Sequence, residues 1–284
     1  MSPLFLVLLI FALGLVQSLF GVGLLLFGTP LLLAGGLSYE QALLWLLPAS
    51  AALSWSQVWD LRGEPLTNGY RRRFFRFCLP ALLVGLVISL QLQLLVPIKW
   101  LVLSMLCLSI SLRLRPAWFE AFQRLLVRRL SAALALTGLI HGLSNMGGSV
   151  LTVLASGLYA EKPKILSAVS LDYAFMASTQ LIVLLTLRPG VWEAKYLLGS
   201  ALALGARYLV GGRLFTLTRD RLYQRLITGF MLANACLLAW TLLAGSGPDI
   251  GQTGQQNRRQ LVSEGRVSDH NSETRVRMPF PGWI

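Results

Sequence analysis

Two stretches of the chain share a glycine pattern: residues 14–23 read GLVQSLFGVG, and residues 138–147 read GLIHGLSNMG. Each lies inside an unusually long apolar segment, the first covering residues 3–36 and the second residues 131–158. A helix needs only about 20 residues to cross the hydrocarbon core of a bilayer. We therefore interpret each long segment as a membrane helix that is broken near its glycine motif.

The composition of the chain excludes an ordinary soluble domain. Hydrophobic residues make up 55% of the sequence and charged residues 13%, whereas about 25% charged residues is usual in soluble proteins. The apolar runs are continuous, which favours helices over the alternating strands of a barrel. Further apolar segments cover residues 41–58, 77–95, 98–112, 165–187, 196–212 and 226–243. The sequence therefore predicts an all-α, polytopic membrane protein with about eight transmembrane segments.

The two motifs also divide the chain into two homologous four-segment halves, each opening with a broken first helix. The predicted parts are a first membrane repeat at residues 1–112, an amphipathic cytoplasmic linker at 113–130, a second membrane repeat at 131–243 and a disordered polar tail at 244–284. The tail is predicted to be disordered because it lacks apolar side chains to bury. Four full spans per half would make the repeats parallel, whereas a re-entrant first segment would make them inverted.

The net charge of +13 comes largely from arginines in short loops. We interpret it as a topology signal and as contact with lipid headgroups, rather than as binding of nucleic acid. The loops after the second, fourth and sixth segments are the more basic set, which predicts that they and both chain ends face the cytoplasm. The basic loop between the seventh and eighth segments argues locally against this. Cys78, Cys107 and Cys236 lie in apolar runs without a CxxC partner, so we expect no disulfide and no metal site.

Paired breaks in two halves point to a substrate site. Freed backbone groups at membrane depth are tolerated only where they are buried in protein or line a cavity, and paired interruptions are a sequence signal for a transporter's binding site. The N-terminus of a half-helix presents N–H donors that suit an anion. We expect the breaks to face each other at the centre, and the substrate-binding residues to be Gln17, Ser18, Gly21, Gly23, Ser144, Asn145, Gly147, Gly148 and Arg207. The alternative is that the glycines only permit close helix packing and the polar side chains only cap half-helices.

Asp172 and Arg207 are the charges that lie most clearly inside apolar segments, where charges are costly and mark functional sites. Their depths allow an ion pair if their two segments are antiparallel neighbours. Such a pair would be structural, or it would hold Arg207 against an anion. Asp172 is also a candidate for binding a coupling proton. His141, one turn before the second break, is another candidate for proton coupling, with simple packing as the alternative.

At these residues the sequence resembles the TauE/SafE family, a group of sulfite exporters and toluene-sulfonate uptake permeases. The resemblance covers about residues 3–243 and rests on Gly14, Ser18, Gly21, Gly23 and Pro30, on Gly138, Gly142, Ser144, Asn145, Gly147 and Gly148, and on Gly205, Arg207, Gly211 and Gly212. The first motif departs from the family's glycine run, because Leu24 stands where a third glycine is common. The family implies secondary transport of small anions, such as sulfite or organosulfonates, by a multi-pass protein of the bacterial inner membrane. It implies no cofactor and no ATP-hydrolysing domain, and the sequence has no Walker P-loop.

Two other functions are open at this point. A membrane assembly or scaffold protein would not require paired broken helices. An intramembrane hydrolase could use Ser144 and His141, which share a helix face, but neither a GxSxG motif nor a clear orienting carboxylate accompanies them. We therefore expect a non-enzymatic transporter whose partners are a small anion and membrane lipid, with association into a homo-oligomer left open.

Overall fold

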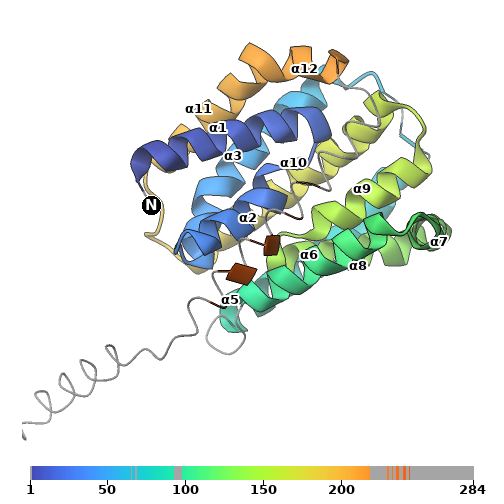
Figure 1. Cartoon of the computed structure of the whole chain (residues 1–284), viewed down its shortest axis with the longest axis horizontal. Coiled ribbons are helices and arrows are strands. Elements are labelled where there is room, and N and C mark those ends of the chain that lie inside the picture. Colours follow the sequence, from blue (N-terminus) through green and yellow to red (C-terminus); the bar gives the residue numbers. More distant parts are fainter. Residues whose placement is uncertain are drawn as a thin grey trace, which may run out of the picture. The chain divides into compact units, whose positions relative to one another are not determined.

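The computed structural model describes residues 2–64, 66–67, 69–92 and 98–217, together with seven isolated positions between 229 and 243. Met1–Leu242 forms one compact unit, and Leu243–Ile284 is separate from it. Figure 1 shows the helices of the described ranges, which are α1 (Pro3–Phe20), α2 (Leu24–Ala34), α3 (Tyr39–Asp60), α4 (Tyr70–Arg73), α5 (Leu79–Leu92), α6 (Ile98–Leu114), α7 (Pro116–Arg128), α8 (Leu130–Ser144), α9 (Gly147–Leu158), α10 (Lys162–Leu187), α11 (Tyr196–Ala206) and α12 (Gly212–Leu217), with π-helical turns η1 (Phe74–Cys78) and η2 (Arg207–Gly211).

The all-α membrane fold predicted from the sequence is confirmed. By length and composition, three stretches of the described residues can cross a membrane: Pro3–Phe20, Tyr70–Gln91 and Lys162–Leu187. The pair α7 and α8 would make a fourth, although the two helices meet at 108°. The count of eight segments stays a prediction, and both the last segment, at residues 226–243, and the tail at 244–284 lie outside the described residues except for isolated positions.

Both predicted helix breaks are present, and they have the same local geometry. Gly21 ends α1 with a φ of 71°, and Asn145 ends α8 with a φ of 61°. Each donates its backbone N–H to the carbonyl four residues earlier, Gln17 O or His141 O, at 2.8 Å. This left-handed cap is the usual end of a helix, and glycine and asparagine are the residues that adopt it most readily.

The chain doubles back at each break instead of continuing across the membrane (Figure 1). A Cβ atom on Gly23 would lie 2.6 Å from Gln17 N, and one on Gly28 would lie 3.1 Å from the Leu13 side chain, so α2 returns along α1. A Cβ atom on Gly147 would lie 2.5 Å from Thr137 O, so α9 returns along α8 in the same way. Each first segment is therefore a re-entrant hairpin with one long and one short arm.

Contacts between the other helices give their relative directions. In a parallel pair of helices, the residue numbers of successive contacts rise together in both helices. Helix α11 is parallel to α1, with contacts Ile10–Gly199 and Gly14–Ala203, and to α3, with contacts Trp45–Tyr196 and Ala49–Gly199. The segment α4–η1–α5 is parallel to α8, with contacts Cys78–Gly138 and Leu82–Gly142, and to α10, with contacts Tyr70–Asp172 and Cys78–Met176. The residue numbers run oppositely along α3 and α10, as shown by Glu40–Arg188 and Gln57–Ser170. Thus α1, α3 and α11 point one way, and α8, α10 and α5 point the other.

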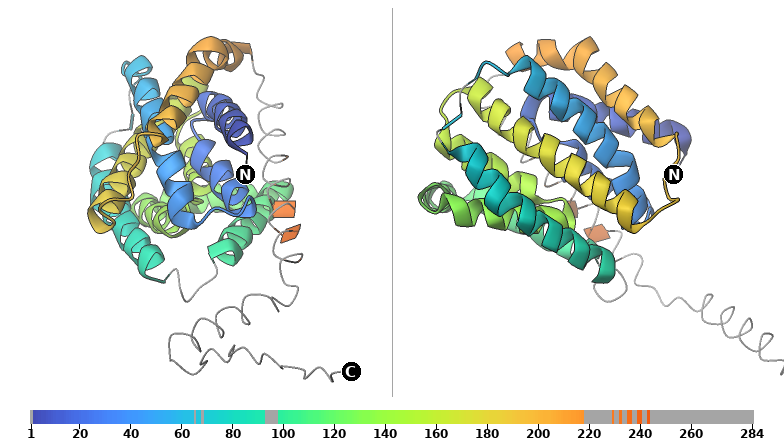
Figure 2. Two further views of the ribbon diagram at one scale, coloured as in Figure 1. Left: turned by 90° about the vertical axis from the view of Figure 1, so that its left-hand side faces the viewer. Right: turned by 180° about the vertical axis from the view of Figure 1, so that it is seen from behind.

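Corresponding segments of the two predicted halves therefore run in opposite directions, which is the inverted arrangement. Helix α3 corresponds to α10, and these two helices pack side by side, with α5 on the far side of α10 (Figure 2). The third segment of each half packs against the hairpin of the other half, α5 against α8 and α11 against α1. The two halves are thus interlocked at their hairpins.

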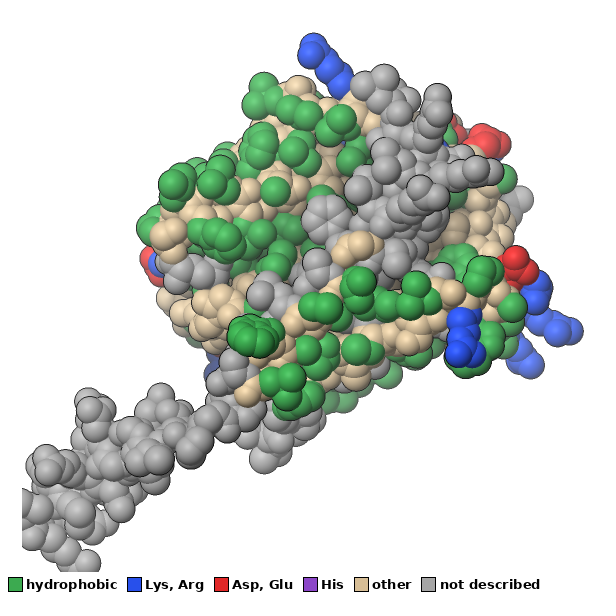
Figure 3. Space-filling view, in the orientation of Figure 1, with side chains coloured by type: hydrophobic (Ala, Val, Ile, Leu, Met, Phe, Trp, Pro, Cys, Tyr) green, Lys and Arg blue, Asp and Glu red, His purple; other side chains and the backbone are tan. Residues whose placement is uncertain are grey.

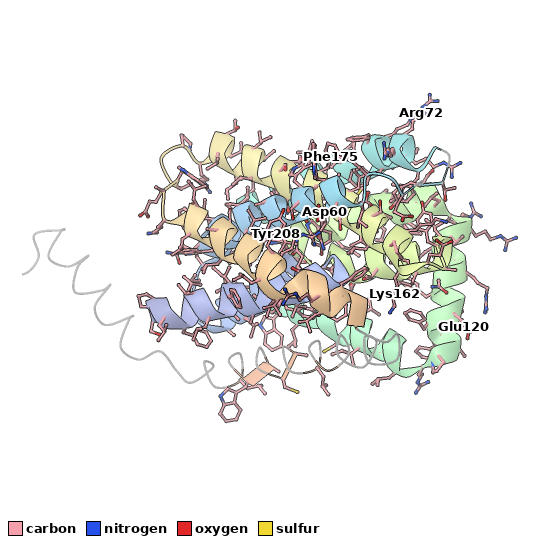
Figure 4. The ribbon with its side chains drawn as sticks, turned by 90° about the horizontal axis from the view of Figure 1, so that it is seen from above. Asp60, Arg72, Glu120, Lys162, Phe175 and Tyr208 are labelled. Carbon is pink, nitrogen blue, oxygen red and sulfur yellow. The ribbon has the colours of Figure 1, made fainter. Side chains whose placement is uncertain are left out.

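The helix directions separate the basic residues into two groups. We call the end of the bundle where α3 and α11 finish and α4, α8 and α10 begin the basic end. It carries fourteen Lys and Arg residues of the described ranges: Arg62, Arg71, Arg72, Arg73, Arg76, Arg113, Arg115, Arg124, Arg128, Arg129, Lys162, Lys164, Arg207 and Arg213. The opposite end carries Lys99, Arg188 and Lys195. Figure 3 shows apolar side chains covering the face between the ends, and Figure 4 shows Arg72, Lys162 and Glu120 together at the basic end.

The orientation expected from the sequence is therefore wrong in one respect. The loop at residues 188–195 was expected on the same side as the basic loops at 61–76 and 113–129, but it lies at the opposite end. The reason is that α9 turns back inside the bundle, so the second half crosses one time fewer than expected. In the first half, α2 turns back along α1 in the same way. As a result α1 begins at the opposite end, although both chain ends were expected inside.

We expect the basic end to face the cytoplasm, because cytoplasmic loops carry the excess of Lys and Arg. In a chain whose three native cysteines are replaced by alanine, a cysteine introduced at the exposed Pro189 should react with a membrane-impermeant maleimide in intact cells. A cysteine introduced at the exposed Arg72 should react only in inverted vesicles. The reverse labelling pattern would contradict this orientation.

Candidate functional site

The first break is closed by the side chain of Gln17, which is fully buried. Its Oε1 accepts a hydrogen bond from Leu24 N at 3.1 Å, and so caps the N-terminus of α2. Its Nε2 donates to Ser54 Oγ at 3.0 Å and to Ser50 Oγ at 3.2 Å, both on α3. The amide of Gln17 therefore ties the two arms of the hairpin to the neighbouring helix.

The carbonyl end of α1 is satisfied by a second glutamine. Gln57 Nε2 donates to Gln17 O at 3.1 Å and to Ser18 O at 3.3 Å. Gln57 Oε1 accepts from Ser170 Oγ of α10 at 3.2 Å. Ser18 Oγ donates back to Gly14 O at 2.7 Å, within its own helix. The polar groups of the first break thus have partners inside the protein.

At the second break a glutamine of α10, Gln180, bonds to the end of α8. Gln180 Nε2 donates to Asn145 Oδ1 at 3.0 Å and to His141 O at 3.5 Å. Asn145 Nδ2 donates to Thr29 Oγ1 of α2 at 3.1 Å. Asn145, which was predicted as a substrate contact, therefore links the second break to the hairpin of the first half.

Several buried polar atoms at the second break form no hydrogen bond of regular geometry: His141 Nδ1, His141 Nε2, Tyr173 Oη and Gln180 Oε1. The Gln180 side chain nevertheless lies close enough to His141 to interact with its ring. The ring centroids of His141 and Tyr173 lie 5.2 Å apart, edge to face. Gly148 lies directly beneath the Tyr173 hydroxyl, since a Cβ atom there would be only 1.8 Å from Oη. An unpaired buried polar atom costs about 1–3 kcal/mol, so a cluster of them calls for an explanation.

Gln17 and His141 occupy the same place in the two glycine motifs, each three residues after the first glycine. Gln17 caps α2, whereas the N-terminus of α9 receives no side-chain cap from its own N-cap residue, Met146. The first N–H groups of a helix have no acceptor inside that helix, and they favour negative charge. At the second break, Met146 N donates to Ser144 Oγ and Ser149 N to Met146 O, but no side chain acts as Gln17 does and reaches back to cap the next helix.

The remaining predicted residues near the breaks have local roles. Ser144 Oγ donates to Ile140 O and accepts from Met146 N, and Ser149 Oγ donates to Met146 O. These bonds shape the turn between α8 and α9. Gly21 and Gly23 allow the close approach of α10 and α1 to the first break.

The two breaks are buried, and their turns contact different parts of α10. Gly21 packs against Leu166 and Val169, whereas Asn145 bonds to Gln180. Val169 and Gln180 are separated along α10 by roughly 16 Å at 1.5 Å per residue. The two hairpins contact each other through the bond between Asn145 and Thr29, and the expectation that they meet at a shared substrate site stays a prediction.

Arg207 does not pair with Asp172, which corrects the pairing considered from the sequence. Arg207 Nη2 lies 2.5 Å from Asp60 Oδ2 at the end of α3. The Arg207 side chain is 10% exposed and the Asp60 side chain 46% exposed. The depths of Asp172 and Arg207 allow a pair only if α10 and α11 are neighbours, but α3 packs against both of these helices. The guanidinium of Arg207 is therefore neutralised at the basic end and is not brought to the second break.

Asp172 instead meets a tyrosine of the other half. The hydroxyl of Tyr70, the first residue of α4, donates to Asp172 Oδ2 at 2.5 Å. Asp172 is fully buried, and its Oδ1 has no hydrogen-bond partner. Sequence reasoning missed Tyr70 and Asp60 as partners, and it missed Tyr173, because a tyrosine inside an apolar run is typical of a packed core.

Comparison with known proteins gives one match. The family model described as "Sulfite exporter TauE/SafE" matches residues 6–239, which include both breaks and the helices around them. No curated protein and no solved structure matches the chain. Proteins of this family are membrane transporters for sulfite or related anions.

Proposed function

Because this chain belongs to the TauE/SafE sulfite exporter family, we propose that it is a secondary transporter that moves small sulfur oxyanions, either sulfite or organosulfonates, across the bacterial inner membrane. It would act as a multi-pass protein without a cofactor or an ATP-hydrolysing domain. The inverted helix directions support this proposal, since inverted repeats with interrupted helices are a recurrent architecture of secondary transporters.

We further propose that the anion binds at the second break, and one observation carries this. At equivalent positions of the two motifs, Gln17 forms hydrogen bonds through both amide atoms, whereas the buried ring nitrogens of His141 form none of regular geometry and have only the Gln180 side chain nearby. The Tyr173 hydroxyl is a further unpaired group, and it lies over Gly148 in the first turn of the same helix.

The chemistry of these groups fits an oxyanion with three oxygens. A His141 ring N–H and the Tyr173 O–H would donate to two oxygens, and backbone N–H groups in the first turn of α9 would donate to the third. The positive end of α9 would offset part of the charge. Asn145 would position this turn through its bonds to Thr29 and Gln180.

The other functions have less support. In a hydrolase, the Ser144 hydroxyl would donate to a nitrogen of His141, but Ser144 Oγ donates to Ile140 O and not to His141. A scaffold role would leave the unpaired groups of the second break without a purpose. Transport accounts for them as the site of a passing ligand.

Replacing His141 with phenylalanine tests the site. The variant keeps the aromatic packing against Tyr173 but loses both nitrogens, so we expect sulfite flux into proteoliposomes to fall by about tenfold or more, because a hydrogen bond to a charged group contributes about 1.5–3 kcal/mol. The thermal stabilisation produced by sulfite should disappear as well. Without sulfite, the melting temperature should stay the same or rise, because unpaired buried atoms are removed.

The matched control is Gln17→Leu, the same kind of change at the equivalent position. It breaks the cap of α2 and the bonds to Ser50 and Ser54, so it should lower the melting temperature even without sulfite. Normal sulfite flux and stabilisation in His141→Phe would place the anion elsewhere. Absence of sulfite and sulfonate flux in the unmodified protein, relative to protein-free vesicles, would refute transport itself.

A further inference from the structure

Asp172 is a buried acid without a cationic partner. Its side chain is fully buried in α10, and among the described residues it forms no salt bridge. The titratable groups that face it are the Tyr70 hydroxyl at the start of α4 and the Cys78 thiol at the end of η1, and Tyr159 lies near Tyr70. None of these three groups carries a positive charge.

An isolated carboxylate at membrane depth is costly, so such an acid holds a proton unless a partner compensates its charge. The hydrogen bond from Tyr70 occupies Oδ2. The other oxygen, Oδ1, has no partner in the described structure and can carry the proton. Asp172 is thus built to change between a neutral and a charged form, with Tyr70 as a donor that holds the carboxyl group in both.

Asp172 is one residue from a group of the proposed anion site, although its carboxyl group faces Tyr70 and Cys78 and not the second break itself. Asp172 directly precedes Tyr173 on α10, and the Tyr173 hydroxyl lies over Gly148 at the second break. Two negative charges within one low-dielectric region repel each other. A bound anion therefore favours the protonated form of Asp172, and a proton on Asp172 favours anion binding, because coupling between two binding sites is reciprocal.

From this arrangement, and resting on the proposed transport function, we infer that Asp172 is the proton-binding site that couples anion movement to protons. One proton binds to Asp172 Oδ1 while one monoanion, such as hydrogen sulfite or a sulfonate, binds at the second break. The two cross together and are released together, so the net charge moved in each cycle is zero. No bond other than the O–H bond of Asp172 is formed or broken.

The test is whether transport carries charge. Proteoliposomes with sulfite and equal pH on both sides are given a membrane potential with potassium and valinomycin. The unmodified protein should not accumulate sulfite in response to either sign of the potential. Asp172→Asn, which imitates the neutral acid in shape, should bind the anion without a proton. It should therefore accumulate sulfite about tenfold at about 60 mV, the potential at which one charge gives that ratio.

Tyr70→Phe is the matched control, because it removes the hydrogen bond but keeps the acid. Its transport should stay independent of the potential, and a potential-driven Tyr70→Phe variant would overturn the assignment of the proton to Asp172. If Asp172→Asn does not fold, the unmodified protein still tests the inference. Potential-driven accumulation of sulfite by the unmodified protein would refute it. Exchange of labelled sulfite across the membrane separates the two proposals. If exchange is present and net accumulation follows the potential, the coupling is wrong and transport stands; if exchange is absent, transport fails.

Discussion

Replacing Gly138 with alanine is expected to lower the stability of the protein by about 3 kcal/mol, at the upper end of the usual cost of overpacking. A Cβ atom at this position would lie 2.1 Å from Cys78 O, which is backbone and cannot rotate away. The neighbouring Gly142 makes an equally close approach, 2.2 Å from Leu82 O. These two glycines form the crossing of α8 with η1 and α5, so a shift there would separate the hairpin of one half from the third segment of the other.

Gly205→Ala is the matched control for Gly138→Ala. Gly205 lies within the helix α11, and a Cβ atom there would meet nothing within 4 Å. Alanine at an unstrained helical glycine stabilises a protein by about 0.4–1 kcal/mol. The melting temperature in detergent, followed by size-exclusion chromatography after heating, should fall for Gly138→Ala and stay equal or rise for Gly205→Ala. Equal melting of the two variants would mean that α8 and α5 do not cross at backbone contact.

The helix breaks could be predicted from the sequence because they depend on local chemistry. A glycine or asparagine in the left-handed conformation ends a helix, and both motifs place such a residue at the same point, Gly21 and Asn145. The doubling back was left open because the direction after a turn depends on packing. The lengths of the second arms held a signal, since residues 24–34 and 147–158 each make a helix of at most about 18 Å, too short to cross the membrane.

The positions of the basic residues also indicated that the first segment of each half turns back. The basic loop after the seventh segment, which contains Arg213, conflicted with the orientation expected for eight full spans. With re-entrant hairpins, Arg213, the described arginine of that loop, lies with the other basic residues at one end of the bundle. A local conflict with the positive-inside rule was therefore a sign of the wrong number of crossings.

The contents of the site were harder to predict, because they depend on which helices become neighbours. His141 and Asn145 were named correctly as lying at the second break, since the motif contains them. Tyr173 comes to the same place only because α10 packs against α9, which folds back along α8. The partner of Arg207 could not be chosen from depth alone, since Asp60 and Asp172 lie on two different helices, α3 and α10, and only the helix packing selects between them.

The ion pair between Asp60 and Arg207 leads to an asymmetric prediction. Asp60→Asn should lower the free energy of unfolding by about 3 kcal/mol, because it leaves a guanidinium that is only 10% exposed without its carboxylate. Arg207→Gln should lower it by about 1 kcal/mol or less, because it leaves a carboxylate that is 46% exposed and can be hydrated. The Nε atom of Arg207 already lacks a partner, so the side chain has little else to compensate its charge.

The double variant Asp60→Asn with Arg207→Gln distinguishes a lost attraction from a buried unpaired charge. If the cost of Asp60→Asn is the burial of an unpaired guanidinium, removing that guanidinium should restore stability to the level of Arg207→Gln alone. If the cost is the lost contact itself, the double variant should be as unstable as Asp60→Asn. Unfolding midpoints of the single and double variants in denaturing detergent give this comparison, and equal costs for the two single variants would contradict the assignment. Because Arg207 lies at the basic end and not at the second break, the binding of sulfite should survive in the double variant, whereas a guanidinium that contacted the anion would abolish that binding when removed.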